Sequence, residues 1–229
     1  MLKKCKLWKL LLFLKFPVLY LHPLNMKKEI ISKSEELFLS LGFKNVTMDD
    51  IASVMGISKK TIYANFSNKT ELVRAVTFSV LEYIYQEIEK INKSAINPIE
   101  ELYQIKMFVM DYLRNERGSA QFQLKKYYPK VFEQLEIKKF EKMHSSVENS
   151  LIKGVELELF RPKIDPAFIS RVYFVGMSGI RDQSVFSEDM FDKNYLMESY
   201  LEYHLRAIVT EKGLGLLNKY IKQNKTQNA

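Results

Sequence analysis

The sequence has few of the residues that build metal sites, disulfide frameworks and β-sheets. Its 229 residues include one cysteine, Cys5, and three histidines, which excludes a disulfide scaffold and any cysteine-based metal centre. Eight glycines and six prolines are few for a β-sandwich or barrel, because such folds need a turn about every 8–12 residues. We therefore expect an all-α protein that holds no metal and no other cofactor.

A long uncharged hydrophobic run is also missing. The most apolar stretch covers residues 7–21, but Lys9, Lys15 and Pro17 interrupt it, whereas a membrane-spanning helix needs about twenty largely uncharged residues. We therefore expect no stable membrane insertion and a cytoplasmic protein. A membrane-tethered helical protein would depend on this stretch alone.

Residues 1–25 nevertheless differ in composition from the rest of the chain. They contain five lysines and no acidic residue, so they carry +5 of the net charge of +8. The basicity of the whole chain is therefore weak evidence for nucleic-acid binding. Three interpretations are open: translation starts at Met26, or the segment is a basic amphipathic arm that touches lipid or DNA phosphates, or it is a secretory signal without a typical cleavage site. We treat it as an atypical leader.

Residues 26–76 carry the pattern of several short helices. Apolar residues recur at helical spacing from Ile30 to Leu41. Thr47 is a suitable N-cap for a second helix, Ser58 caps a third that ends near Phe66, and a fourth follows from residue 68. The sequence therefore predicts a small helical domain over residues 26–85.

The spacing between the second and third of these helices is typical of a helix-turn-helix. Two short helices that cross at about 90–120° need a small residue where they meet, a residue that tolerates positive φ in the turn, and a bulky apolar anchor in the second helix. Ala52, Gly56 and Ile62 meet these three needs in order. With Phe66 they form the predicted helix-turn-helix core.

The polar face of this unit is suited to DNA. The second helix of a helix-turn-helix presents its N-terminal side chains to base edges in the major groove. Lysines and hydroxyls bind phosphates, Asn65 can pair with adenine and Lys60 can reach guanine. The predicted DNA contacts are Thr47, Lys59, Lys60, Thr61, Tyr63, Asn65 and Lys69. A plain helical packing module is the alternative, because residues 26–76 hold eight bases against six acids.

Three runs in this stretch, 46–52, 55–66 and 68–72, closely resemble the DNA-binding domain of TetR-family transcriptional regulators. The resemblance covers residues 27 to about 85. It implies that Thr47, Tyr63 and Lys69 contact phosphates and that the helix beginning at Lys59 reads bases. Lys60 stands where the family often has glycine, so we expect Lys60 to contact a base or a phosphate.

No catalytic constellation is present. Glu141 and His144 form a Glu-x-x-His pair, but a di-iron bundle needs two such pairs and two further glutamates, and Glu202 and His204 have the wrong spacing for the second pair. A Ser/His/Asp arrangement, a phosphate-binding loop and a cysteine nucleophile are missing too. We expect the protein not to be an enzyme.

Residues 86–229 are predicted to form a larger helical domain for regulation and dimerisation. Prolines at 98, 129 and 166 suit the first turns of helices, and Lys212 with Gly213 suggests an interruption near the end. The expected helices span residues 99–117, 130–159, 167–186, 194–209 and 214–223.

This predicted domain is rich in aromatic residues and methionine. Such residues usually form a core, but together they can also enclose an adaptable apolar cavity. The candidate pocket residues are Tyr103, Met107, Met110, Tyr128, Phe132, Phe174 and Met177. An inward-pointing Arg181 would add a charge to such a pocket, although an exposed arginine is the ordinary case.

Broad apolar faces on residues 167–186 and 194–209 favour burial against a second subunit. In TetR-family proteins the corresponding helices pair as a four-helix bundle, which implies a homodimer. We therefore expect a regulator, by default a repressor, that binds palindromic double-stranded DNA and is released by an unidentified small-molecule effector. A ligand-independent DNA-organising protein is the alternative, and a cavity of about 300 Å³ or more would separate the two.

Overall fold

The computed structural model describes residues 23–112, 119–187 and 189–227. Regular structure within these ranges is helical, apart from one isolated antiparallel bridge between Phe160 and Val209. The all-α fold that the sequence predicts is confirmed.

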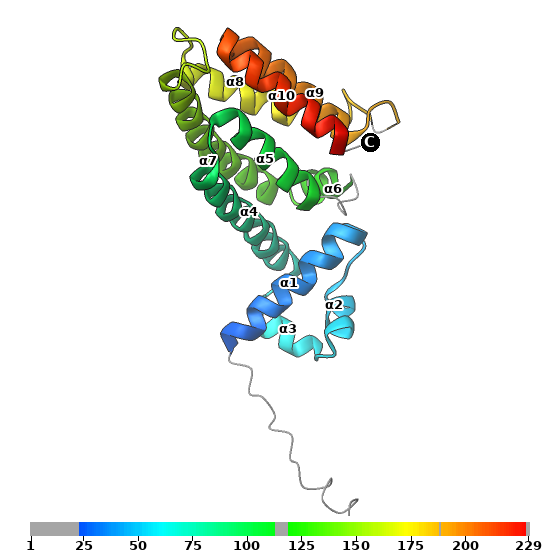
Figure 1. Cartoon of the computed structure of the whole chain (residues 1–229). Helices are drawn as coiled ribbons and strands as arrows, with labels where there is room; N and C mark the ends of the chain where they lie inside the picture. Colours follow the sequence, from blue (N-terminus) through cyan, green and yellow to red (C-terminus); the bar gives the residue numbers. More distant parts are fainter. Residues whose placement is uncertain (1–22, 113–118, 188, 228–229) are drawn as a thin grey trace, which may run out of the picture.

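A small lower unit and a larger upper unit share one long helix (Figure 1). The lower unit holds α1 (Pro23–Leu41), α2 (Met48–Met55) and α3 (Lys59–Asn65), and α4 (Lys69–Ser94) runs from it into the upper unit. The upper unit also contains α5 (Pro98–Tyr112), α6 (Ser119–Tyr127), α7 (Pro129–Glu156), α8 (Pro166–Gly179), α9 (Lys193–Ile208) and α10 (Glu211–Gln227).

The two units are packed together as well as joined by α4. Phe38 of α1, Ile51 of α2 and Ile62 of α3 are fully buried in one hydrophobic cluster, to which Leu124 of α6 and Val131 of α7 also belong. The upper unit therefore completes the core of the lower one. The boundary predicted between residues 85 and 86 falls inside α4, which continues across it without a break.

A second core holds the upper unit together. Ile99 of α5, Leu151 of α7, Leu205 of α9 and Leu217 of α10 are buried at 1% exposure or less, and Phe160 joins them from the connection between α7 and α8. This core is separate from the first, so the upper unit has its own hydrophobic support.

Several helix ends differ from the sequence-based expectation. α1 begins at Pro23, so residues 23–25 belong to the helix and not to a separate leader. α8 ends at Gly179 and not near residue 186, because the carboxylate of Asp182 accepts the backbone N–H of Ser184 at 2.9 Å and starts a turn. The predicted end of the helix after residue 112 lies outside the described ranges.

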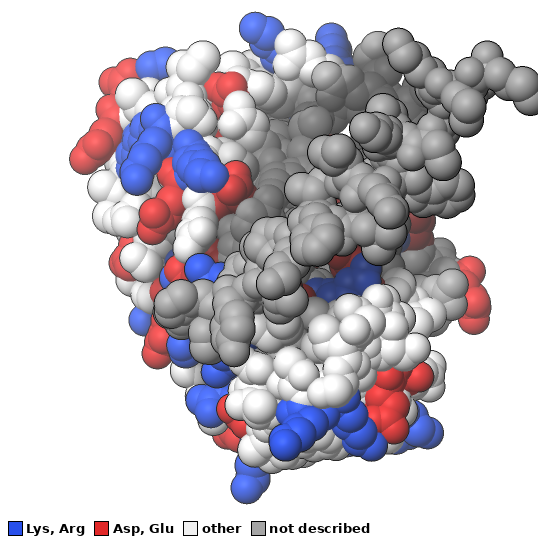
Figure 2. Space-filling view, turned by 90° about the horizontal axis from the view of Figure 1, so that it is seen from below, with Lys and Arg blue, Asp and Glu red and all other residues white. Residues whose placement is uncertain are grey.

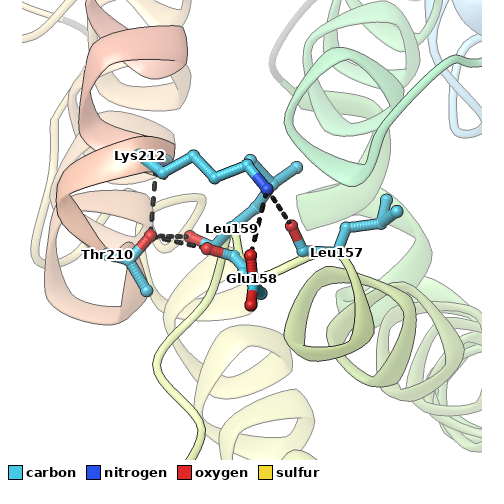
Figure 3. A network of polar contacts seen from close by, with 6 residues as sticks. Leu157, Glu158, Leu159, Thr210 and Lys212 are labelled. Atoms are coloured by element: carbon cyan, nitrogen blue, oxygen red, sulfur yellow. Dashed lines mark hydrogen bonds and ion pairs between the residues drawn. The ribbon is translucent and has the colours of Figure 1, made fainter.

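The interruption before the last helix falls at Val209–Thr210, and the prediction of Lys212–Gly213 is wrong (Figure 3). The backbone N–H of Thr210 donates to the Leu159 carbonyl at 3.0 Å, and the Thr210 hydroxyl donates to the Glu158 carbonyl at 2.8 Å. Lys212 Nζ donates to the Leu157 carbonyl at 2.9 Å. These contacts dock the α9–α10 junction onto the turn after α7.

Among the described helices, none combines the length and the hydropathy that a bilayer crossing requires. Residues 1–22, which make up most of the atypical leader, lie outside the described ranges.

Candidate nucleic-acid interface and cavity

The start of α2 is fixed by a reciprocal cap. The Thr47 hydroxyl accepts the backbone N–H of Asp50 at 3.1 Å, and the Asp50 carboxylate accepts both the backbone N–H and the hydroxyl of Thr47 at 2.8 Å. The bonds from Thr47 lower the pKa of Asp50 below its usual range. Thr47 remains exposed at this corner.

The turn after α2 depends on one glycine. Gly56 ends α2 at a φ of 63°, in the left-handed region that favours glycine. A Cβ on Gly56 would meet no heavy atom within 4 Å, so the backbone conformation and not the available space requires it. Ala52, Ile62 and Phe66, the other predicted core positions, are buried.

Helix α3 holds its outer side chains at the solvent side of that core. Ser58 caps the helix by accepting the backbone N–H of Thr61 at 3.1 Å. Lys59, Lys60 and Tyr63 are exposed, whereas Thr61 and Asn65 are half-buried. The structure thus brings all five predicted contacts of this helix to one end of the lower unit.

Three of these side chains already have polar partners within the protein, and one of the three is Thr61, whose hydroxyl is hydrogen-bonded to the Ser58 hydroxyl at 2.8 Å. Lys59 Nζ forms an exposed ion pair with Asp49 at 2.7 Å, which raises the pKa of Lys59, and the Asn65 amide donates to the backbone carbonyl of Thr61 at 2.8 Å. An exposed pair of this kind contributes little to stability, so a phosphate could compete for Lys59. Asn65 would have to exchange its own bond for one to a base.

Lys69 lies beside the cap of α2 although it belongs to α4. Its Nζ donates to the Lys44 carbonyl at 3.3 Å, and the Asp50 carboxylate is near enough to oppose the fall in the pKa of Lys69 that burial causes. Lys69 and Thr47 therefore flank the same carboxylate. Two predicted phosphate contacts, separated in sequence, meet at one corner.

The lower end of the molecule is of mixed charge. In the view from below, basic and acidic side chains alternate over the part of the surface that the described residues form (Figure 2). This distribution agrees with eight bases and six acids in residues 26–76. Affinity for phosphates would therefore come from the placement of a few lysines and hydroxyls, not from a continuous basic patch.

Helix α6, which the sequence left unassigned, connects the upper unit to the lower one. Gln123 of α6 accepts the backbone N–H of Lys44 at 2.8 Å, and a Cβ on Gly42 would lie 2.5 Å from the same amide side chain. Pro129 and the glycine-containing stretch before residue 119 were the available sequence signals for a separate short helix.

A mostly apolar cavity of about 240 Å³ lies between α4 and its neighbours in the upper unit. On α4 it is lined at helical spacing from Thr77 to Ile88, and Leu39 and Phe43 of the lower unit also line it. The other helices contribute Leu102, Ile105, Lys106, Val109, Gln121, Leu124, Leu135, Lys139, Met143, Ser146, Val147, Tyr173, Met177, Met197 and Leu201, and Arg181 follows α8.

Six of the seven predicted pocket residues lie elsewhere, and only Met177 lines the cavity. Tyr103 is in the upper core, stacked on Tyr220 at 5.9 Å. Tyr128 and Phe132 pack against the core of the lower unit. Phe174 packs edge-on against the Phe140 ring. Met107 is 46% exposed, and Met110 is half-buried. The apolar stripe on α4 was the better signal for the cavity.

Helices α8 and α9 expose apolar side chains to solvent. Phe168, Val172 and Val175 follow each other at helical spacing on α8 and are 61%, 43% and 67% exposed, and Tyr195 and Tyr203 are exposed on α9. Such a stripe is unusual for a surface that only water covers.

Comparisons with known proteins agree with this architecture. Residues 30–76 match the family described as "Bacterial regulatory proteins, tetR family". The uncharacterized HTH-type transcriptional regulator YvaF of Bacillus subtilis is 23% identical over 82% of this chain and 97% of its own length.

Two solved structures have the same fold. SmeT, the repressor of the Stenotrophomonas maltophilia multidrug efflux pump SmeDEF, superposes with a TM-score of 0.63 at 19% identity, covering 81% of this chain and 91% of SmeT. A protein from Saccharomonospora viridis, solved in complex with choline, has a TM-score of 0.68 at 16% identity, covering 81% and 98%.

The helix-turn-helix and the helical upper unit define a DNA-binding transcriptional regulator. The DNA-binding domain of this chain, residues 30–76, belongs to the TetR family of these regulators. The family is not one of enzymes.

Proposed function

We propose that the protein is a homodimeric repressor that binds a palindromic DNA site and leaves it when a small molecule enters the upper unit. The observation that carries this proposal is the outer face of α3, where Lys59, Lys60 and Tyr63 are exposed beside the corner formed by Thr47 and Lys69. In a helix-turn-helix dimer the two reading helices stand about 34–36 Å apart, one turn of DNA.

Within this proposal the DNA contacts divide by role. Lys59, Lys69, Thr47 and Tyr63 bind phosphates and set the position of the protein on the duplex. Lys60 and Thr61 face base edges from the first turn of α3, and Asn65 faces them from its last residue. Because Lys60 is longer than the glycine common in the family, it reaches a base or phosphate that the backbone of α3 would otherwise approach.

The direct test is to map bound DNA in the native organism and to measure affinity for the resulting site by fluorescence anisotropy at several salt concentrations. Lys69→Ala should weaken binding to all sequences and reduce the slope of log K against log salt by about one. Lys90→Ala, which removes an exposed lysine on the same helix far from the lower unit, is the control.

A change at Asn65 should instead alter which base is preferred. Equal losses at every sequence would refute its reading role. If the wild-type protein shows no preference for any DNA sequence, the proposal fails as a whole.

The exposed stripe on α8 supports the homodimer. Sedimentation should show a dimer for the wild type and a monomer for Val175→Arg, because a charge in a dimer interface would be buried without a partner. Ile96→Arg is the control, since Ile96 is 80% exposed but lies outside the stripe. A monomeric wild type would exclude this arrangement.

The cavity supports regulation by a small molecule over a ligand-independent DNA-organising role through its position and not through its volume. It is somewhat smaller than the 300 Å³ lower limit expected for drug-sized ligands, but Leu39 and Phe43 of the lower unit line it together with α9. SmeT has been solved with triclosan and the Saccharomonospora viridis protein with choline. Switching such a dimer decisively needs about 5.5 kcal/mol of differential binding.

A further inference from the structure

The charges around the cavity have one sign. Its lining includes Lys106, Lys139 and Arg181 and no aspartate or glutamate. Lys106 and Lys139 are half-buried, and Arg181 is exposed. Three cations in a mostly apolar wall disfavour a cationic ligand and favour an anionic one, most strongly at the two half-buried lysines, where less water screens the charge.

Lys106 is the best placed of the three to bind an anion. Its side chain on α5 is only 10% exposed, and it forms an ion pair with Glu198 of α9, a residue outside the lining. The same ammonium lies 5.5 Å from the centre of the Tyr103 ring. An ammonium has three donors and no acceptor, so Glu198 holds Lys106 in place while capacity for a second oxygen acceptor remains.

Lys139 of α7 also lines the cavity and is held by a similar pair. Its Nζ lies 2.7 Å from Glu136, which does not line the cavity, and its backbone carbonyl accepts the hydroxyl of Tyr85 at 3.2 Å. Two lysines that form ion pairs therefore line the cavity, and their acidic partners do not.

The shape limits the ligand further. The lining of α4 from Thr77 to Ile88 extends over about 16 Å at about 1.5 Å per residue. The volume of about 240 Å³ is below the range of about 300–1,000 Å³ that is usual for drug-sized ligands. An elongated cavity of this volume suits a slim chain better than a polycyclic molecule.

We propose that the effector is a slender apolar monocarboxylate whose carboxylate is bound by Lys106, with Lys139 and Arg181 adding positive potential. This rests on the proposed function, since it names the ligand class of the same cavity. The apolar tail lies along the α4 stripe, and the carboxylate shares the Lys106 ammonium with Glu198.

Calorimetry on the full-length protein with three probes of equal length tests the charge preference. Octanoate should bind at least about tenfold more tightly than 1-octanol, a difference of about 1.4 kcal/mol, and octylamine should bind least. The proposal is overturned if 1-octanol or octylamine binds as tightly as octanoate, or if octanoate does not bind at millimolar concentration.

Variants of Lys106 test the site itself. Lys106→Met should lower the affinity for octanoate about tenfold and leave the affinity for 1-octanol unchanged. The double variant Lys106→Met/Glu198→Gln should have the same effect, and it leaves no carboxylate without its partner. Lys142→Met is the control: it lies three residues from Lys139 on α7, outside the lining, and faces Glu82. Unchanged octanoate affinity in both Lys106 variants would exclude this anchor.

Anisotropy with the mapped DNA site separates this proposal from the proposed function. Sequence-specific DNA binding without octanoate binding would overturn the ligand class and leave the regulator intact. Octanoate binding that depends on Lys106, in a protein that does not select any DNA sequence, would support the ligand class and reject the proposed function.

Discussion

At the scale of single residues, Thr77 is the clearest case of a side chain placed against the usual rules. It is 7% exposed on α4, lines the cavity, and its hydroxyl has no hydrogen-bond partner among the described residues. A buried hydroxyl without a partner costs about 1–3 kcal/mol. Such a cost is offset when a ligand supplies the missing partner.

Replacing Thr77 with the nearly isosteric valine should therefore stabilise the empty protein by about 1 kcal/mol, measured as the free energy of unfolding in urea. Thr210→Val provides the contrast, because the Thr210 hydroxyl donates to the Glu158 carbonyl and accepts the backbone N–H of Gly213, so its loss should destabilise. A destabilised Thr77→Val would mean that the hydroxyl has a partner, such as a bound water.

His204 makes stability depend on pH. It is buried between Tyr173 and Tyr200, at ring distances of 4.7 and 6.1 Å, and burial lowers the pKa of His204 to about 4 from 6.5. The folded state thus favours the neutral ring. Its contribution is complete above pH 6.5 and is lost as the pH falls from there toward 4.

The measurable consequence is a difference in unfolding free energy between pH 7.5 and pH 5. The wild type should lose on the order of 2 kcal/mol more over this interval than His204→Phe, which has no proton to bind. Both proteins carry the same other titrating groups, so the comparison isolates the histidine. An equal loss in the two proteins would show that His204 titrates normally.

At the scale of elements, the ends of helices are set by two different kinds of signal. Local caps such as Thr47 and Ser58 act within a few residues and are visible in the sequence. Gly213 looks like a similar local break, yet it lies inside α10, where a Cβ would come within 2.1 Å of the Leu159 carbonyl oxygen. This glycine is needed for the close approach of another segment, which no local pattern reveals.

Gly213→Ala should therefore destabilise the protein by about 1–3 kcal/mol, since a backbone carbonyl cannot move aside cheaply. Gly215→Ala, two residues further along the same helix, is the matched control: a Cβ there meets nothing within 4 Å, and alanine favours a helix by up to about 1 kcal/mol. Thermal unfolding of both variants checks this. The expectation is wrong if Gly213→Ala is as stable as the wild type.

At the scale of the whole molecule, α6 is where the cavity and the lower unit come into contact. Gln121 and Leu124 of α6 line the cavity, whereas Gln123 between them accepts the backbone N–H of Lys44. The Lys44 carbonyl in turn accepts Lys69 Nζ. A displacement of α6 by a ligand would thus be passed through two hydrogen bonds to a predicted phosphate contact.

Gln123→Ala should weaken this connection without unfolding either unit. We expect the Lys44 amide to exchange with solvent roughly fivefold faster, since one bond worth about 1 kcal/mol is removed. We also expect octanoate to change DNA affinity less than in the wild type. Gln134→Ala, an exposed glutamine on α7, is the control. Unaltered Lys44 exchange would show that the turn is held by other contacts.

The helix-turn-helix was determined by the sequence alone because its signals are short in range. Caps, a positive-φ glycine and three core positions lie within twenty residues of one another, and each acts on its own turn of helix. The cavity was decided only by the tertiary structure. Its wall combines single faces of seven helices, and which faces meet depends on how the helices cross. An aromatic such as Tyr103 therefore entered the core, while Lys106, one turn further along α5, came to line the cavity.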